Sequence, residues 1–338
     1  MPLLVLTDSG LYCEAGDFFI DPWRPVERAV VTHAHGDHLR SGSRHYIMAR
    51  AGARIAQTRL GEGAPIVAGV EYGDAADFRG VRVTLFPAGH ILGSAQVRIE
   101  HHGEVWVVSG DYKTEPDPTC APFEPIRCHT FITESTFGLP IYRWRPQAEI
   151  FADIDDWWRL NRDAGRSSVL FGYALGKAQR LLAGVDTGIG PIYTHGATET
   201  MVTLYRESGI ALPPTLPVNA APPRTDWSSA LILAPPGTES SPWMRRFGDS
   251  STAFASGWMQ VRGARRRRSL DRGFALSDHV DWPGLLSTIE ATGAEKVLVT
   301  HGFTQAVVRY LTERGIGAEA IATRFEGDEV TEDSEPPA

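Results

Sequence analysis

A dense cluster of histidine and aspartate directly follows an apolar run near the start of the chain. The segment reads VVTHAHGDH over residues 30–38, and its polar members are His33, His35, Asp37 and His38. Neutral imidazoles and carboxylates this close together are costly to bury unless each finds a partner. Zinc and manganese take imidazole nitrogen and carboxylate oxygen as ligands. The cluster therefore predicts a metal site at the end of a strand, and the rival interpretation is a solvated, histidine-rich turn.

The spacing within the cluster indicates two metal ions rather than one. Side chains at positions i and i+2 of an extended segment share a face, so His33 and His35 can aim at one ion. Asp37 and His38 are then placed for a second ion close by. Such a pair needs a bridging ligand and further ligands from elsewhere in the chain. Three residues occur in similar settings, each beside a glycine after an apolar run: His90 in FPAGHILG, Asp111 in VWVVSGD and His301 in KVLVTHG.

Length and charge limit the class of protein. A chain of 338 residues exceeds what one small core needs, so we expect two domains or one domain with a large insertion. The net charge of −8 argues against a uniformly basic nucleic-acid-binding surface, but a local basic cleft remains compatible with it. Three cysteines without a CxxC pair suit a reducing compartment. With neither a signal peptide nor an apolar span in evidence, we expect a cytoplasmic protein without membrane contact.

The pattern of elements changes twice along the chain. Residues 1–140 are rich in short strands, with a hairpin expected to turn at residues 101–103. Residues 141–269 contain helical periodicity and a strand–turn–helix unit typical of parallel sheets. Strands that end in polar residues return over 270–326. Residues 327–338 are acidic and are expected to be a disordered tail.

These motifs resemble those of the metallo-β-lactamase superfamily. THAHGDH is similar to its HxHxDH signature, and His90 and Asp111 are similar to its third and fourth motifs. TESTFG with Glu134, LSDHVDW with His279 and VTHG with His301 resemble motifs A, B and C of the β-CASP nucleases within that superfamily. Together with VLFGYALGKAQRLL and SGWMQVRG, they look most like the bacterial ligase-associated DNA exonucleases. The resemblance implies an α/β (α+β) fold, an αββα metallo-β-lactamase sandwich with an inserted β-CASP α/β domain.

The resemblance also implies roles for the site residues and two divalent metal ions, zinc, manganese or both. One metal would be held by His33, His35 and His90, and the other by Asp37, His38 and His301, with Asp111 as the bridge. His279 is then the candidate general acid, because imidazole titrates near the pH of the cell, and Glu134 would orient it. A purely structural Glu–His contact is the alternative for that pair. Asp278 is a candidate for supporting either its own loop or a ligand histidine, and Asp21 is a candidate for the same.

The implied function is a two-metal phosphodiesterase, a DNA exonuclease acting on single-stranded ends in DNA repair, alongside a ligase or helicase. Arg262, Arg265 and Arg266 in VRGARRRR, and Lys177 at the start of a helix, are candidate substrate contacts. A solvated hairpin tip and an ordinary surface lysine are the respective alternatives. Three other functions stay open: a β-CASP ribonuclease in RNA processing, a small-molecule metallo-hydrolase, and a non-catalytic partner in a repair assembly.

Overall fold

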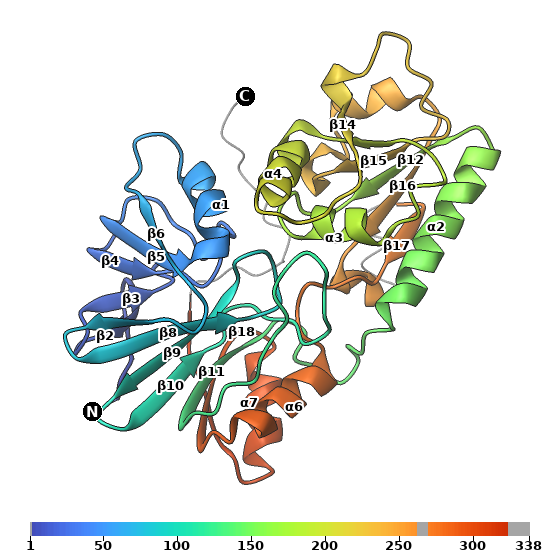
Figure 1. The fold of residues 1–338 in the computed structure, drawn as a ribbon. Helices are drawn as coiled ribbons and strands as arrows, with labels where there is room; N and C mark the ends of the chain where they lie inside the picture. Colours follow the sequence, from blue (N-terminus) through green and yellow to red (C-terminus); the bar gives the residue numbers. More distant parts are fainter. Residues whose placement is uncertain (1, 262–269, 324–338) are drawn as a thin grey trace. The chain divides into compact units, whose positions relative to one another are not determined.

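The computed structural model describes residues 2–261 and 270–323 (Figure 1). The contacts divide these residues into two compact units. The first unit contains residues 2–143 and 279–323, and the second contains residues 144–261 and 270–278. The sequence-based boundaries at 140/141 and 269/270 stay predictions, and the predicted tail at 327–338 lies outside the described residues.

The first sheet of the first unit has six strands in chain order. Its strands are β1 (Val5–Thr7), β2 (Gly10–Cys13), β3 (Phe18–Ile20), β4 (Arg28–Val30), β5 (His45–Ala49) and β6 (Val67–Val70). Strands β1 to β3 pair antiparallel, and β3 to β6 pair parallel. Helix α1 (Arg50–Leu60) packs on β5 and β6.

The second sheet has seven strands and mixes both kinds of pairing. Its spatial order is β19 (Gly317–Ala320), β18 (Lys296–Gly302), β11 (Thr130–Ser135), β10 (Glu104–Val108), β9 (Ala95–His101), β8 (Val81–Pro87) and β7 (Ala75–Phe78). Strands β7 to β10 are antiparallel neighbours, whereas β10, β11, β18 and β19 are parallel. The hairpin expected at residues 101–103 is confirmed, because β9 and β10 pair His101 with Glu104.

The two sheets pack face to face over one apolar core. Phe18 and Ile20 of the first sheet and Val97 and Ile132 of the second belong to the same buried cluster. Helices α6 (Trp282–Thr292) and α7 (Thr304–Thr312) bury Ile289 and other apolar residues against the opposite face of the second sheet. The layers therefore run helix, sheet, sheet, helix. The αββα sandwich expected from the sequence is confirmed (Figure 1).

The second unit is an α/β domain on a parallel sheet. The strand order is β14 (Leu216–Pro217), β13 (Ile192–Thr194), β15 (Leu231–Ala234), β12 (Ser167–Phe171), β16 (Ser250–Ala255) and β17 (Arg272–Phe274). Every residue of the central strands β12 and β15 is buried, as expected for a parallel sheet covered on both faces. Among its described residues, the helical elements are α2 (Gln147–Asp163), α3 (Lys177–Gly184) and α4 (Gly196–Glu207), with the 3-10 turns η1 (Val218–Ala220), η2 (Pro236–Thr238), η3 (Pro242–Phe247) and η4 (Gly257–Gln260).

Both faces of this third sheet carry apolar clusters. Ile154 and Trp158 of α2 and Leu181 of α3 pack with Leu170 and Leu233 on one face. The other face buries a second cluster that includes Val169, Phe171 and Phe254. None of the helices in the described part of the chain has the length and hydrophobicity of a membrane span.

Candidate metal centre

The direction of the strands brings the chemically competent residues of the first unit to one edge. Strands β8 and β10 both pair antiparallel with β9, so they run in the same direction. Strands β10, β11 and β18 are parallel. The residues that follow β8 and β10, and those that close β11 and β18, therefore meet at the same edge of the second sheet. These residues are His90, Asp111, Glu134 and His301.

A tight group of nitrogen and oxygen atoms forms around His35. The Nδ1 atom of His35 lies 3.1 Å from Nε2 of His33 and 3.0 Å from Nε2 of His90. Oδ2 of Asp111 lies 3.5 Å from Nε2 of His33 and 3.8 Å from Nε2 of His90. One ligand atom from each of these four residues lies within 4.8 Å of all the others. This number and type of ligand atoms suits a tetrahedral zinc or a similar divalent cation.

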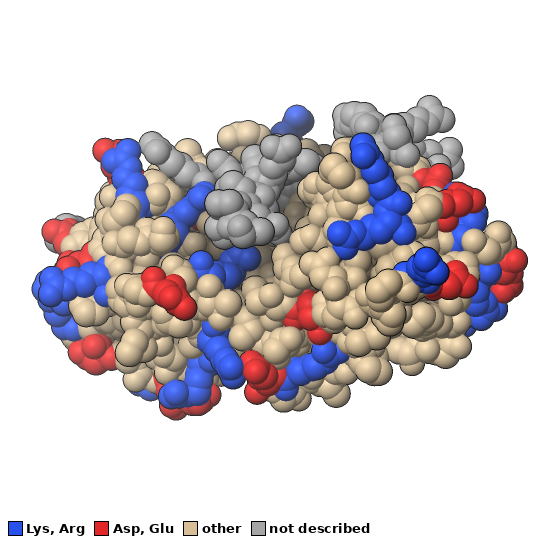
Figure 2. Space-filling model, turned by 90° about the horizontal axis from the view of Figure 1, so that it is seen from above, with Lys and Arg blue, Asp and Glu red and all other residues tan. Residues whose placement is uncertain are grey.

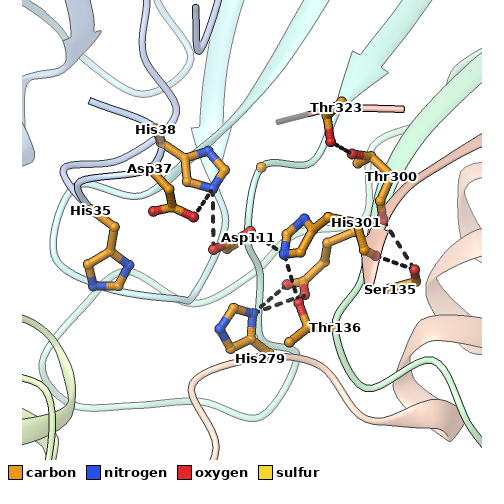
Figure 3. A network of polar contacts seen from close by, with 12 residues as sticks. His35, Asp37, His38, Asp111, Ser135, Thr136, His279, Thr300, His301 and Thr323 are labelled. Atoms are coloured by element: carbon orange, nitrogen blue, oxygen red, sulfur yellow. Dashed lines mark hydrogen bonds and ion pairs between the residues drawn. The ribbon is translucent and has the colours of Figure 1, made fainter. Parts of the chain in front are cut away.

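A second and looser group adjoins Asp111. Nε2 of His38 lies 3.5 Å from Oδ2 of Asp37 and 3.5 Å from Oδ2 of Asp111. Nε2 of His301 lies 3.9 Å from Oδ1 of Asp111. Figure 3 shows Asp111 between His38 and His301. Asp111 thus contacts both groups of predicted ligands, the position that a bridging carboxylate requires.

Glu134 and His279 form a hydrogen-bonded pair beside Asp111. Nδ1 of His279 lies 2.9 Å and 3.0 Å from the two carboxylate oxygens of Glu134. Asp111, Glu134 and His279 also offer ligand atoms within 4.8 Å of one another. The Glu134 oxygens, however, already accept hydrogen bonds from the backbone N–H of Tyr112 at 2.8 Å and the hydroxyl of Thr136 at 2.5 Å. A carboxylate so occupied fits orientation of the imidazole better than ligation of a metal.

Asp21 holds the inner side of the His38 ring. The two are fully buried, and Nδ1 of His38 lies 2.7 Å from Oδ2 of Asp21. The same carboxylate accepts the Thr32 hydroxyl at 2.6 Å and the Thr32 backbone N–H at 2.7 Å. An aspartate that receives the Nδ1 proton leaves the Nε2 lone pair facing Asp111, which is the tautomer a metal ligand needs. The suggestion that Asp21 supports a ligand histidine therefore gains a geometric basis.

The surroundings of His33 and His38 shift the pKa values of these two buried histidines in opposite directions. Burial, together with the neighbouring His38, holds the pKa of His33 well below its usual value, so His33 is neutral, as a ligand must be. Burial opposes a charge on His38 as well, but Asp37, Asp111 and Asp21 raise its pKa well above the usual value. The pKa of Asp111 is lowered despite its burial, because His38 lies against it. A site that attracts a proton so strongly also favours a divalent cation.

The residues present fit divalent metal ions. Oδ1 of Asp111 is buried, and no hydrogen-bond partner reaches it among the residues that the structure describes. A buried carboxylate oxygen without a partner costs free energy, and a bound cation would satisfy it. Gly110 allows the approach, because a Cβ there would lie 2.7 Å from Cβ of Thr32 and the residue has a positive φ of 56°.

The predicted substrate contacts stay predictions, and Lys177 is the one among them that lies in the described part of the chain. Lys177 is 1% exposed, and its Nζ atom donates to the carbonyl of Leu276 at 2.7 Å within the second unit, so it is not the surface lysine that the sequence suggested. Arg262, Arg265 and Arg266 lie outside the described residues. On the face that Figure 2 shows, the basic and acidic side chains of the described residues are scattered over uncharged surface.

Three supporting residues escaped the sequence-based prediction. Thr32 lies between Asp21 and the two buried histidines, with its hydroxyl 3.0 Å from Nδ1 of His33. The Thr136 hydroxyl lies 3.0 Å from Nε2 of His301. Arg180 binds Asp278, the residue before His279. The threonines carry no signal of their own in the sequence, whereas Arg180 stands one helical turn after Lys177 in GKAQR.

Comparison with known proteins gives partial matches of two kinds. The chain matches no known family model. It is 34% identical over 325 residues to a protein named Probable DNA ligase from Opitutus terrae, which covers 95% of this chain and 31% of that protein. It is also 32% identical over 125 residues to Endoribonuclease ysh-1 of Neurospora crassa, and 32% identical over 119 residues to Endoribonuclease YSH1 of Saccharomyces cerevisiae. Those matches cover 36% and 35% of this chain but only 14% and 15% of the endoribonucleases.

A solved structure supports the fold alone. The crystal structure of a protein of unknown function from Enterococcus faecalis V583 superposes with a TM-score of 0.59 and 13% sequence identity. The match covers 88% of this chain and 80% of that one. The chain thus shares its architecture with a known protein, and it spans less than a third of the curated relative that it matches over most of its length.

Proposed function

We propose that the chain is a metal-dependent nuclease of the β-CASP type within the metallo-β-lactamase superfamily. The observation that carries the proposal is the convergence of His33, His35, His90 and Asp111, with the His279–Glu134 pair beside them. The names of the relatives add support, since both kinds are enzymes that act on nucleic acid. A small-molecule hydrolase would need the same metal ligands but has no evident use for a 17-residue helix and a parallel sheet in a second unit.

We assign each proposed ligand to one of two cations. His33, His35 and His90 would hold one cation, Asp37, His38 and His301 the other, and Asp111 would contact both. When bound, two divalent cations supply Lewis acidity, which lowers the pKa of water and offsets the negative charge that builds on a phosphodiester. The native metals are zinc, manganese or both, because the imidazole and carboxylate set suits either.

We assign to His279 the role of proton donor to the leaving group. Glu134 engages Nδ1 of His279, so the proton available for transfer is on Nε2. In hydrolysis the oxygen of water forms the new bond to phosphorus and the bond to the leaving sugar oxygen breaks. The leaving sugar oxygen takes the Nε2 proton of His279, and the proton released by water passes to solvent. Glu134 stabilises the imidazolium before the transfer and orients the ring throughout.

We favour DNA over RNA as the substrate, and a single-stranded end over a duplex. The match to the protein named for DNA ligase extends over 95% of this chain, whereas the endoribonuclease matches extend over about a third. A ligase-named relative that contains a segment similar to this chain also supports a role in DNA repair beside a ligase. RNA processing is the alternative that the endoribonuclease matches support.

The test is digestion of matched single-stranded DNA and RNA, each labelled at either the 5′ or the 3′ end, with zinc or manganese. The expected result is stepwise shortening of DNA from one end. Preferential cleavage of RNA would move the proposal to the ribonuclease alternative. Hydrolysis of small esters with none of oligonucleotides would contradict it.

Variants separate the proposed roles. His35→Ala should lose both metal and activity. His279→Ala should keep its metal and lose about 10²-fold or more in rate, the usual contribution of a positioned general acid. His45→Ala is the matched control, because this histidine is 57% exposed on β5. If His279→Ala strips the metal instead, the assignment of a proton donor is wrong.

A further inference from the structure

Three charged side chains are buried together in the second unit. Lys177 and Arg180 of α3 are 1% and 3% exposed, and Asp278 is 5% exposed. Oδ2 of Asp278 lies 2.9 Å from Nζ of Lys177, and Oδ1 lies 2.9 Å from Nη1 of Arg180. The carboxylate is therefore held by a different cation on each oxygen.

The same two cations also bind the main chain just before Asp278. Nζ of Lys177 donates to the carbonyl of Leu276 at 2.7 Å, and Nη1 of Arg180 donates to the carbonyl of Ser277. Arg180 is fixed in turn from α2, since its Nε donates to the side-chain oxygen of Gln147 at 2.7 Å. Three consecutive residues, 276–278, are thus fastened to one turn of α3.

Stability alone is a poor explanation for this arrangement. Burying charged groups forfeits their hydration, and well-packed apolar residues stabilise a core at least as well as a buried ion cluster. What the cluster adds is a fixed backbone position for residues 276–278, because each bond holds one atom of this short segment. That position matters for the next residue, His279.

His279 follows Asp278 directly. Consecutive Cα atoms are about 3.8 Å apart, so the backbone at Asp278 limits where His279 can stand. The His279 ring is held at Nδ1 by Glu134 at 2.9 Å. One end of the residue is therefore fixed through its side chain, and the preceding peptide is fixed through α3.

We propose that Lys177 and Arg180 are positioning residues that fasten residues 276–278 and thereby place the His279 imidazole for proton transfer. The inference rests on the proposed function, because it needs His279 to act as the proton donor. It replaces the expectation that Lys177 binds substrate, since the buried ammonium is engaged by Leu276 and Asp278.

The test uses leaving groups that differ in their need for a proton. A sugar oxygen leaves well only when protonated, whereas 4-nitrophenolate leaves as an anion. Rates are measured for the full chain on an oligonucleotide and on thymidine 5′-(4-nitrophenyl phosphate). For Lys177→Met we expect kcat on the oligonucleotide to fall about 10- to 100-fold, with KM within about threefold. The nitrophenyl ester should be cleaved at nearly the wild-type rate, and His279→Ala should show the same selectivity.

Two further variants make the comparison sharp. Lys177→Arg keeps the charge and should recover most of the lost oligonucleotide rate. Leu233→Ala, in the apolar core of the same unit, is a control for general destabilisation. It should lower the melting temperature and leave the ratio of the two rates unchanged. If Lys177→Met does not fold, the double variant Lys177→Met, Asp278→Asn removes both charges of this ion pair. It then tests the positioning role in the same assay and by the same ratio of rates.

Each remaining outcome counts against a defined statement. Equal loss on both substrates by a folded, metal-loaded Lys177→Met overturns the positioning role. A raised KM with unchanged kcat overturns it too, and returns Lys177 to substrate binding. A wild-type protein that cleaves neither substrate refutes the proposed function itself, which is a separate result.

Discussion

Replacing Asp21 with asparagine should weaken metal binding at one site, because it moves the ring proton of His38 from Nδ1 to Nε2. The carboxylate now accepts from Nδ1 of His38, from the Thr32 hydroxyl and from the Thr32 backbone N–H. An asparagine oxygen can keep the backbone bond, but its NH₂ group cannot accept the other two. It would instead donate toward Nδ1 of His38 and move the ring proton to Nε2, the atom that faces Asp111. The ring would then present N–H where a ligand must present a lone pair.

The size of the effect follows from the lost contacts. Removing such an outer partner lowers metal affinity by about 10- to 100-fold, or roughly 1.4 to 2.8 kcal/mol. Loss of two hydrogen bonds to a buried charge should lower the free energy of unfolding of the metal-free protein by about 3 to 6 kcal/mol. Backbone strain does not confuse the result, because Asp21 has a positive φ of 41° that asparagine also tolerates.

The assay is competition of the metal-free protein with a chromophoric chelator for zinc and manganese. One equivalent should bind about 10- to 100-fold more weakly. The other should change less, since Asp21 contacts His38 directly and reaches His33 through intermediaries such as the Thr32 hydroxyl. Asp17→Asn is the matched control, with a φ of 53° and a side chain paired with Arg28 at the surface. If Asp21→Asn binds both metals as the wild type does, His38 is not a ligand that Asp21 orients.

Two other predictions concern the framework of the first unit. Gly93→Ala should cost more than about 4 kcal/mol of unfolding free energy or prevent folding, because its Cβ would lie 2.2 Å from the backbone of Gly52. Gly73→Ala, with a similar positive φ and open space around it, should cost only about 1 kcal/mol, and equal losses in urea denaturation would refute the steric argument. All three cysteines are buried, and burial raises the pKa of Cys128 to about 11, so thiol reagents at pH 8 should react slowly with the native protein. Three equivalents should react after unfolding, and rapid labelling of the native state would contradict the burial.

The αββα fold could be predicted because its signal is local and repeated. An apolar run that ends in a polar residue predicts a buried strand. Because β10, β11 and β18 are parallel, their polar carboxyl ends lie on the same side of the sheet. The grouping of His90 with Asp111 follows from the same rule, whereas His35 follows β4 of the first sheet and joins them through the packing of the two sheets. Their roles as ligands stay predictions that metal analysis must test.

The role of Lys177 could not be read from the sequence, because it depends on a contact between distant segments. Residues 177 and 276 meet only through the packing of α3 against the segment after β17. That strand is three residues long, Arg272–Phe274, and carries little periodic signal. The same pattern, GKAQR at the start of a helix, describes a surface lysine and a buried anchor equally well, and only the fold separates them.

The position of β18 has a consequence for synthesis on the ribosome. This strand lies between β11 and β19, and its register pairs Thr130 with Lys296. The whole second unit must therefore be translated before β18 and β19 can complete the second sheet beside β11. At about 5 to 20 residues per second, that wait lasts on the order of ten seconds or more. During it, the nascent chain exposes an unpaired edge at β11 and lacks His279 and His301, so a truncated product would carry an aggregation-prone edge and an incomplete centre.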